Sequence, residues 1–560
     1  MSMERKGEYP YTLSSVLLDY LASRGIRFLF GVAGSAERDL FDNLAREEYA
    51  GKIRFIQANS EYPAARMSVG YARASGKISP LILHIQVGPA NAALAILDAY
   101  IAGIPLLIFS VGHISVRTDF KEALYGYFRT AELLREYCKY VYRVVDPDSF
   151  DKVLRRAIRL AETPPKGPVF LTVSQDIAEK KLAKREVKEA ELFNPSPPEA
   201  SVSRAAEALR KAEKPVILTQ RTRKREAVPL LVQLAEKVAA AVFEVRPCTM
   251  NFPSSHPLHQ GYAGDRDSRM NDYVGSSDLV LALDCFNPPL TYSGLNIQVS
   301  DNPLAFNEEA DINVFCSTDL FLNALLMKLR DMKPDYEKIE ELKAKHAEKR
   351  NKWMNDLKSR FDDEPPSPQR VWFEVNRIFN GGKDYVLYFA PGYSQRLSVQ
   401  RYLEREEPGC FYSCLSAAMG TAGEAIGIQL AEKRRVICAL GDFEAHVSQL
   451  PTLLWTCAHH QIPVIWMVLD NGSGAIVKRS YWTYGKCMRD RGVFIGTELK
   501  DPKTEWTKIA EANNVRSLKC ENAEELRQGL AEALETKGPV LLSVLTQTFE
   551  NPPEGWRDNP

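Results

Sequence analysis

Short apolar runs alternate with longer segments of helical periodicity along almost the whole chain. The run SPLILHIQVG (79–88) is almost continuously apolar, and it is followed by the helical segment PANAALAILDAYIA (89–102). Apolar strands separated by helices are typical of parallel sheets that are buried on both faces. The pattern therefore predicts an α/β protein built from doubly wound parallel sheets.

The apolar runs fall into three blocks. Strands of the first block are expected at 27–35, 54–61, 79–88, 104–113 and 167–176. Those of the second are expected at 214–220, 277–284 and 311–317, and those of the third at 384–392, 436–442, 464–471 and 538–546. The last strand of the third block, GPVLLSV, resembles that of the first, GPVFLTV, which favours an internal duplication of one α/β unit.

Two segments without apolar runs separate the blocks. Residues 184–201 are charged and rich in proline, as in a linker, and residues 335–360 are charged throughout. We therefore predict a first domain at 1–185, a central Rossmann-like domain at 200–332, a helical linker at 333–365 and a last domain at 366–560.

The composition is that of a globular protein, with 45% hydrophobic and 26% charged residues. Lys+Arg and Asp+Glu both total 72, so no global field favours nucleic acid or an anionic membrane as a partner. The N-terminus lacks a signal-peptide core and no run of about 18 apolar residues occurs, so a soluble cytoplasmic protein is expected. The basic run Arg221–Arg225 is interpreted as a solvated loop.

Two neighbouring apolar runs end on groups that bind cations. VICAL is followed by Gly441-Asp442, and VIWMVL by Asp470-Asn471. Taken singly, an Asp at a strand end is usually a helix cap, and DN before Gly is usually a turn. Because ligands bind at the carboxyl ends of parallel strands, Asp442, Asn471 and the backbone carbonyl of Ser473 are together predicted to bind Mg²⁺.

The spacing of these groups resembles a known cofactor motif. GDF, 26 residues (444–469) and DN are similar to the thiamin diphosphate motif of the family that contains benzoylformate decarboxylase and acetolactate synthase. The resemblance extends to NSEYPAARMSVGYAR, GVAGSAERDLF, VGPANAALAILDAYIAGIPLLIFSVG, SSHPLHQGYAG and CLSAAMGTAGEAIGIQLA. It implies that the first block is a pyrimidine-binding domain and the third a diphosphate-binding domain.

The resemblance also implies roles for individual residues. Glu61 matches the glutamate that activates the cofactor, and Met419 the side chain that wedges between its rings, although a Met is usually core. Further cofactor contacts are implied at Tyr393, Ser394, Ala417, Gly441, Asp442, Phe443, Asn471, Ser473, Gly474 and Ala475.

Candidate substrate residues come mostly from the first block. His84 and Ser35 match catalytic residues of benzoylformate decarboxylase, and acetolactate synthases differ at His84. His84 could carry a proton near neutral pH, or it could be a satisfied structural histidine. His113 is a weaker catalytic candidate, and Val477 resembles a residue that lines the substrate pocket.

The chain departs from the family pattern in several places. Phe443 replaces a glycine and Asp470 an asparagine, so Asp470 either adds charge near the cation or turns away from it. The segment MGTAGEAIG is one residue shorter than usual, and 283–294 holds no second catalytic histidine. The segment 219–227 lacks a glycine-rich turn, which argues against bound FAD.

The sequence thus predicts a lyase that uses thiamin diphosphate and Mg²⁺ to decarboxylate a 2-oxo acid to an aldehyde. The alternatives are an acetolactate synthase-like carboligase, an acyl-CoA lyase, a C–C hydrolase, and a non-catalytic paralogue acting as a structural or regulatory subunit. The resemblance implies a homodimer or a dimer of dimers with its active site at the subunit interface. The expected partner is a small carbonyl substrate, without nucleic acid or membrane.

Overall fold

The computed structural model describes residues 9–84, 87–112, 130–390, 395–414 and 419–549, and in these ranges it contains three six-stranded parallel sheets. All strand pairs within the sheets are parallel, so the predicted α/β class with three parallel sheets is confirmed. The chain divides into two compact units, residues 1–193 and residues 194–560.

The first unit contains one sheet with the strand order β2-β1-β3-β4-β6-β5. Its strands in that order are β2 (Arg54–Gln57), β1 (Phe28–Gly31), β3 (Ser79–Ile82), β4 (Leu106–Gly112), β6 (Val169–Ser174) and β5 (Tyr140–Val144). Its helices are α1 (Leu13–Ser23), α2 (Arg38–Leu44), α3 (Glu61–Ser75), α4 (Val87–Ala102), α6 (Thr130–Leu133), α7 (Phe150–Glu162) and α8 (Gln175–Ala178).

The second unit begins with the central sheet, whose strand order is β12-β11-β10-β7-β8-β9. Its strands are β12 (Ile312–Phe315), β11 (Leu295–Ser300), β10 (Leu279–Leu283), β7 (Pro215–Thr219), β8 (Ala241–Glu244) and β9 (His259–Tyr262). The helices that accompany it are α9 (Glu199–Lys211), α10 (Ala227–Val238), α11 (Met270–Ser276) and α12 (Thr318–Lys328).

The last sheet has the order β14-β13-β15-β16-β18-β17. Its strands are β14 (Phe411–Ser413), β13 (Tyr385–Phe389), β15 (Arg435–Gly441), β16 (Ile465–Asp470), β18 (Val540–Leu545) and β17 (Arg516–Cys520). Its helices are α14 (Pro368–Phe379), α15 (Arg396–Tyr402), α16 (Glu424–Ala431), α17 (Asp442–Val447), α18 (Leu450–His460), α19 (Ala475–Tyr484), α20 (Lys486–Arg491), α21 (Trp506–Ala512) and α22 (Ala523–Glu535).

The first and last sheets have the same topology. When the strands of each sheet are counted along the chain, both sheets read second, first, third, fourth, sixth, fifth. The similar segments GPVFLTV and GPVLLSV supply β6 and β18, which are the sixth strands of the two sheets. The shared topology supports the duplication inferred from these segments.

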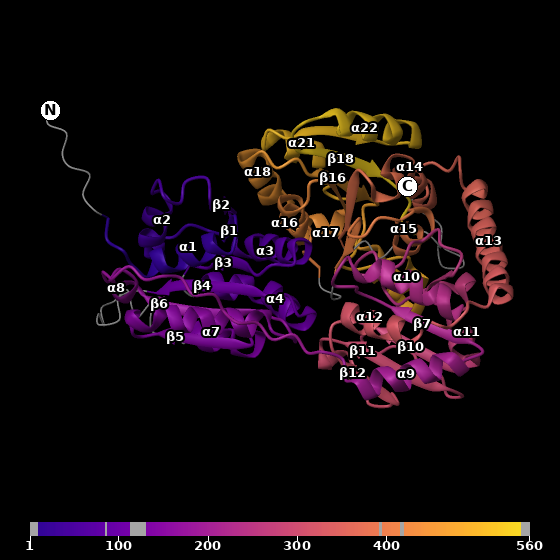
Figure 1. Ribbon diagram of the computed structural model, residues 1–560. Coiled ribbons are helices and arrows are strands. Elements are labelled where there is room, and N and C mark those ends of the chain that lie inside the picture. Colours follow the sequence, from indigo (N-terminus) through magenta and orange to yellow (C-terminus); the bar gives the residue numbers. More distant parts are fainter. Residues whose placement is uncertain (1–8, 85–86, 113–129, 391–394, 415–418, 550–560) are drawn as a thin grey trace. The chain divides into compact units, whose positions relative to one another are not determined.

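A single long helix, α13 (Tyr336–Ser359), joins the central and last sheets (Figure 1). It packs against β9 of the central sheet and α15 of the last domain. Its N-terminus is capped by Asp335, whose side chain accepts a hydrogen bond from the backbone nitrogen of Lys338. No helix in the described ranges is long and apolar enough to cross a membrane.

Candidate active site

The two predicted metal-binding strand ends are neighbours in the last sheet. β15 pairs in parallel with β16, with Gly441 opposite Leu469. Asp442 begins α17 directly after β15, and Asn471 directly follows β16. Parallel pairing brings the two carboxyl ends to the same edge of the sheet, as the sequence predicted.

The side-chain oxygens at this edge converge on one backbone nitrogen. Ser473 N donates to Asp442 Oδ2 and to Asn471 Oδ1, and both distances are 3.1 Å. Phe443 N donates to Asp442 Oδ1 at 2.8 Å, which fixes the orientation of the carboxylate. A carboxylate and an amide oxygen held this close together could both bind a hard cation.

The electrostatics of Asp442 also fit a cation. Burial, together with the nearby charge of Asp470, raises the pKa of Asp442 to about 7. Asp470 itself turns toward Gly472, whose nitrogen donates at 3.1 Å, and toward Lys503, whose Nζ lies 3.4 Å from Oδ2. The hydroxyl of Ser473 is buried and has no hydrogen-bond partner among the described residues. A divalent cation with diphosphate oxygens would satisfy both groups, so the residues fit thiamin diphosphate and Mg²⁺.

The turn after Asn471 holds the remaining candidates of this edge. Gly474 N donates to Thr497 O at 2.7 Å, and Ala475 N donates to the Ser473 carbonyl at 2.8 Å. The ring of Phe443 lies beside Gly474, since a Cβ built there would be 3.4 Å from Phe443 Cδ2. Val477 is exposed on α19. Phe443, which replaces a glycine of the motif that this segment resembles, therefore lies beside this turn.

Glu444 is a residue of this site that the sequence did not reveal. Its buried carboxylate accepts hydrogen bonds from Gly420 N at 2.9 Å, Thr421 N at 2.7 Å and Ser448 Oγ at 2.8 Å. It thereby ties the segment that begins at half-buried Met419 to α17, the helix that Asp442 starts. No sequence signal identifies the contacts with Gly420 and Thr421, because these partners are backbone groups. Tyr393, Ser394, Ala417 and His113 lie outside the described residues.

Glu61 stands at the N-terminus of α3 in the first unit. It directly follows the loop after β2, and it is 9% exposed. Asn91 Nδ2, from α4, donates to Glu61 Oε2 at 3.0 Å. One carboxylate oxygen is therefore oriented by Asn91, and this contact was not expected from the sequence.

His84 follows β3 and pairs with a buried glutamate. Its Nδ1 lies 2.8 Å from Oε2 of Glu37, a residue of the turn after β1. This hydrogen bond is the main cause that raises the pKa of His84, and the charge of Glu61 adds to it. Glu37 was not predicted as a site residue, because an acidic residue at the start of the segment ERDLF is typical of the exposed first turn of a helix.

Gly34 makes room for this pair. A Cβ at position 34 would lie 2.0 Å from His84 Nδ1 and 2.6 Å from Glu37 Oε2. The neighbouring Ser35 is exposed at the start of the turn. The carboxyl edge of this sheet therefore combines the His84 imidazole, the buried carboxylate of Glu61 and the exposed hydroxyl of Ser35.

The basic run Arg221–Arg225 is only partly solvated: Lys224 is exposed, but the prediction of a solvated loop is wrong for Arg221. Arg221 is 4% exposed, and its guanidinium carbon lies 4.4 Å from the ring centroid of Phe286. Arg223 Nε lies 2.8 Å from Asp301 Oδ1, beyond the end of β11. The start of the run is buried because acidic and aromatic partners from distant parts of the chain meet it at the carboxyl edge of the central sheet.

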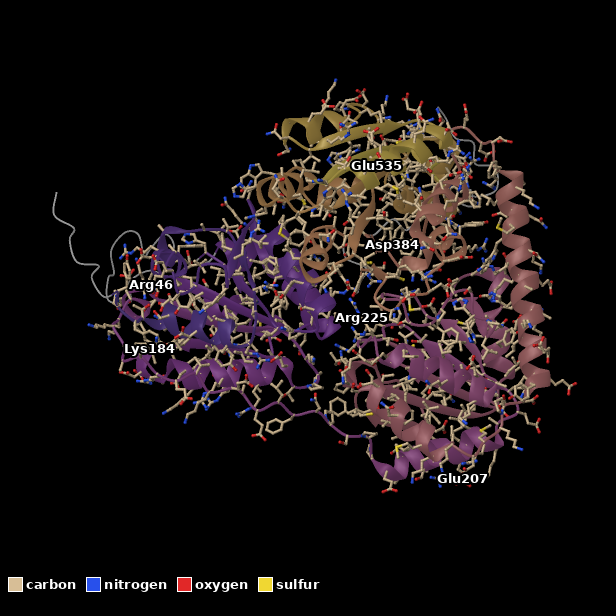
Figure 2. The ribbon with its side chains drawn as sticks, turned by 45° about the horizontal axis from the view of Figure 1, so that its top comes forward. Arg46, Lys184, Glu207, Arg225, Asp384 and Glu535 are labelled. Atoms are coloured by element: carbon tan, nitrogen blue, oxygen red, sulfur yellow. The ribbon has the colours of Figure 1, made fainter. Side chains whose placement is uncertain are left out.

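The end of the same run joins the two domains of the second unit. Lys224 Nζ pairs at 2.8 Å with Asp319 of α12, within the central domain. Arg225, labelled in Figure 2, donates to the hydroxyl of Tyr412 at 3.1 Å and forms an ion pair with Glu432. The contacts of Arg225 hold the central domain against the last domain.

Known proteins match the chain along most of its length. Family models of the N-terminal TPP binding domain, the central domain and the C-terminal TPP binding domain of thiamine pyrophosphate enzymes match residues 11–130, 202–325 and 392–544. Benzoylformate decarboxylase of Pseudomonas aeruginosa is 25% identical over 96% of this chain and 99% of its own length. The acetolactate synthase large subunit of Lactococcus lactis is 26% identical over 98% and 94%.

A solved structure has the same fold as this chain. The 4-hydroxybenzoylformate decarboxylase of Rhodococcus jostii has a TM-score of 0.80 at 21% identity and covers 96% of this chain and 100% of its own.

Proposed function

The chain belongs to the thiamine pyrophosphate enzyme family, and from this premise we propose that it decarboxylates a 2-oxo acid to an aldehyde. The observation that carries the proposal is the His84–Glu37 pair beside Glu61. Aldehyde formation requires a proton at the carbon that has lost CO₂, and an imidazolium stabilised near neutral pH is suited to supply it.

When bound, thiamin diphosphate supplies the carbon nucleophile that adds to a ketone carbonyl and accepts the electron pair left by CO₂. Asp442, Asn471 and Ser473 would hold Mg²⁺, because their oxygens match its ligand preference and buried Asp442 needs a counter-charge. Met419 would support the cofactor rings.

Glu61 would hydrogen-bond the pyrimidine ring of the cofactor. Asn91 donates to its Oε2, and among the described residues no hydrogen bond to Oε1 competes with that contact. Ser35 is exposed next to Gly34 and would hold the substrate carboxylate, with Val477 lining the pocket. We further propose that a homodimer or a dimer of dimers completes the site.

The proposal is tested by titrating thiamin diphosphate into the apoprotein with Mg²⁺ and, in parallel, with EDTA. The loaded protein is then given pyruvate and benzoylformate, and CO₂, aldehyde and acyloin are measured. Metal-dependent binding with aldehyde release is expected. Formation of an acetohydroxy acid would contradict the proposal and show that the protein is a carboligase. Binding without CO₂ release would favour an acyl-CoA lyase or a C–C hydrolase, and no binding would favour a non-catalytic subunit.

A further inference from the structure

A lysine lies in the buried face of the long helix α13. The buried residues of this helix recur at helical spacing and are Leu342, His346, Lys349, Trp353 and Leu357. Lys349 is 5% exposed. Burying an ammonium group in such a face costs free energy unless a carboxylate is paired with it. The groups around Lys349 therefore decide whether its side chain is protonated.

The surroundings of Lys349 provide no such carboxylate. Its Nζ lies 3.3 Å from the carbonyl oxygen of His259, which also accepts a hydrogen bond from His346 Nδ1 at 2.7 Å. The acidic residues that act on it from a distance, Asp265 and Asp267, are both paired with Arg401, at 2.5 and 3.1 Å. No carboxylate in the described part of the chain forms an ion pair with Lys349.

Burial consequently favours the neutral amine. The pKa of Lys349 is lowered to about 7, mainly by desolvation. The charges of Asp265 and Asp267 oppose this shift, and that of Arg350 adds to it. A neutral amine has a free electron pair and is a nucleophile, as in lysines that react with carbonyl compounds.

Lys349 is one of the residues that line a cavity of about 720 Å³ at the amino edge of the central sheet. This is the size of a small-molecule site. Ala241 and Leu342 supply apolar wall, and Lys214 and Lys345 supply cationic groups. The cavity is also lined by the carboxylates of Glu213, Asp267, Asp272, Glu341 and Glu348. Lys345 is paired with Glu341 on α13, whereas Lys214 forms no ion pair with any described residue. The cavity thus combines a buried amine with a cation that could bind a carboxylate.

We propose that Lys349 is a covalent binding site for a small oxo acid, with Lys214 pairing with the carboxylate of that acid. The amine attacks the oxo carbon and forms a C–N bond. The carbonyl oxygen leaves as water with two protons taken from nitrogen, and a neutral imine remains. No oxidant or reductant is required. The site is separate from the candidate diphosphate site, and the proposal does not depend on the proposed function.

The test uses glyoxylate as the probe, with cyanoborohydride to reduce the imine to a stable carboxymethyl amine. The full-length protein is treated at pH 7 over a range of glyoxylate concentrations, and labelled peptides are quantified by mass spectrometry. Saturating labelling of Lys349, at least about tenfold above Lys345, is expected. Labelling that rises linearly with concentration, or that spares Lys349, would overturn the proposal.

Lys345 is the matched internal control. It lies on the same helix and lines the same cavity, but its hydrogen bond to Glu341 raises its pKa, so it stays protonated. The variant Lys349→Met keeps the length and apolar character of the stem, and it should abolish the saturable label. The variant Lys214→Met should leave Lys349 reactive but raise the half-saturating glyoxylate concentration several-fold. An unchanged concentration would remove Lys214 from the site.

Discussion

Asp442 and Asn471 each place a side-chain oxygen 3.1 Å from the same atom, the backbone nitrogen of Ser473. The two residues end neighbouring parallel strands, so the sheet itself brings them together. The pKa of Asp442 is raised, and the Ser473 hydroxyl has no hydrogen-bond partner among the described residues. Both observations, like the convergence of the two oxygens, fit a cation bound at this edge of the sheet.

Asp442→Ala should therefore weaken the metal-dependent binding of thiamin diphosphate. Loss of one charged ligand corresponds to roughly one to two orders of magnitude in affinity. Fluorescence titration with Mg²⁺ and with EDTA measures this. Asp384→Ala is the control, since Asp384 is exposed before β13 and belongs to no site (Figure 2). Equal affinities for the two variants would locate the metal elsewhere.

Glu444→Ala should loosen the segment that holds Met419. The backbone nitrogens of Gly420 and Thr421 would lose their buried acceptor, at a cost of about 1–3 kcal/mol each. A lower melting temperature of the apoprotein and weaker cofactor binding are expected. Glu444→Gln keeps one oxygen acceptor and should fall between wild type and Glu444→Ala in both measurements. If both variants melt and bind like wild type, the contact has no positioning role.

Glu37→Gln should shift the pH dependence that is due to His84. The pairing raises the pKa of His84 above its usual 6.5. It therefore stabilises the folded state fully below pH 6.5, and that stabilisation is lost as the pH rises through the folded pKa. The basic limb of the kcat/KM profile should move to lower pH in the variant. A profile that stays in place would show that the protonation of His84 does not limit turnover.

The strand ends of the site could be predicted because β15 and β16 are buried on both faces and are almost wholly apolar. The edge strands β5 and β17 could not. Their sequences, YVYRV and RSLKC, are only partly buried, so they carry no continuous apolar run. Both occupy the same position in their sheets, which the duplication explains.

The hydrogen-bond partners of the site residues could not be predicted from the sequence either. Glu37 and His84 are 47 positions apart, and Asn91 and Glu61 are 30 apart. Periodicity shows which side chains are buried, but it does not show which polar groups meet. The same reason made the buried Arg221 look like a solvated residue, because its partner Phe286 comes from a distant loop.

Gly34→Ala tests whether the His84–Glu37 pair needs its present geometry. The φ of Gly34 is −132°, which alanine adopts without strain, so the only effect is the added Cβ. That atom would overlap His84 Nδ1 at 2.0 Å, and the imidazole must move. We expect kcat to fall by about tenfold or more, while cofactor affinity stays within about twofold, since a misplaced acid affects proton transfer and not binding.

Gly275→Ala is the matched control for this variant, because a Cβ on Gly275 in α11 meets no atom within 4 Å. It should leave kcat unchanged. Steady-state kinetics and cofactor titration of the two variants separate the outcomes. Wild-type turnover in Gly34→Ala would mean that His84 acts from another position or does not act at all. If Gly34→Ala loses both cofactor binding and turnover, the substitution disturbs the whole carboxyl edge of the sheet and not the His84–Glu37 pair alone.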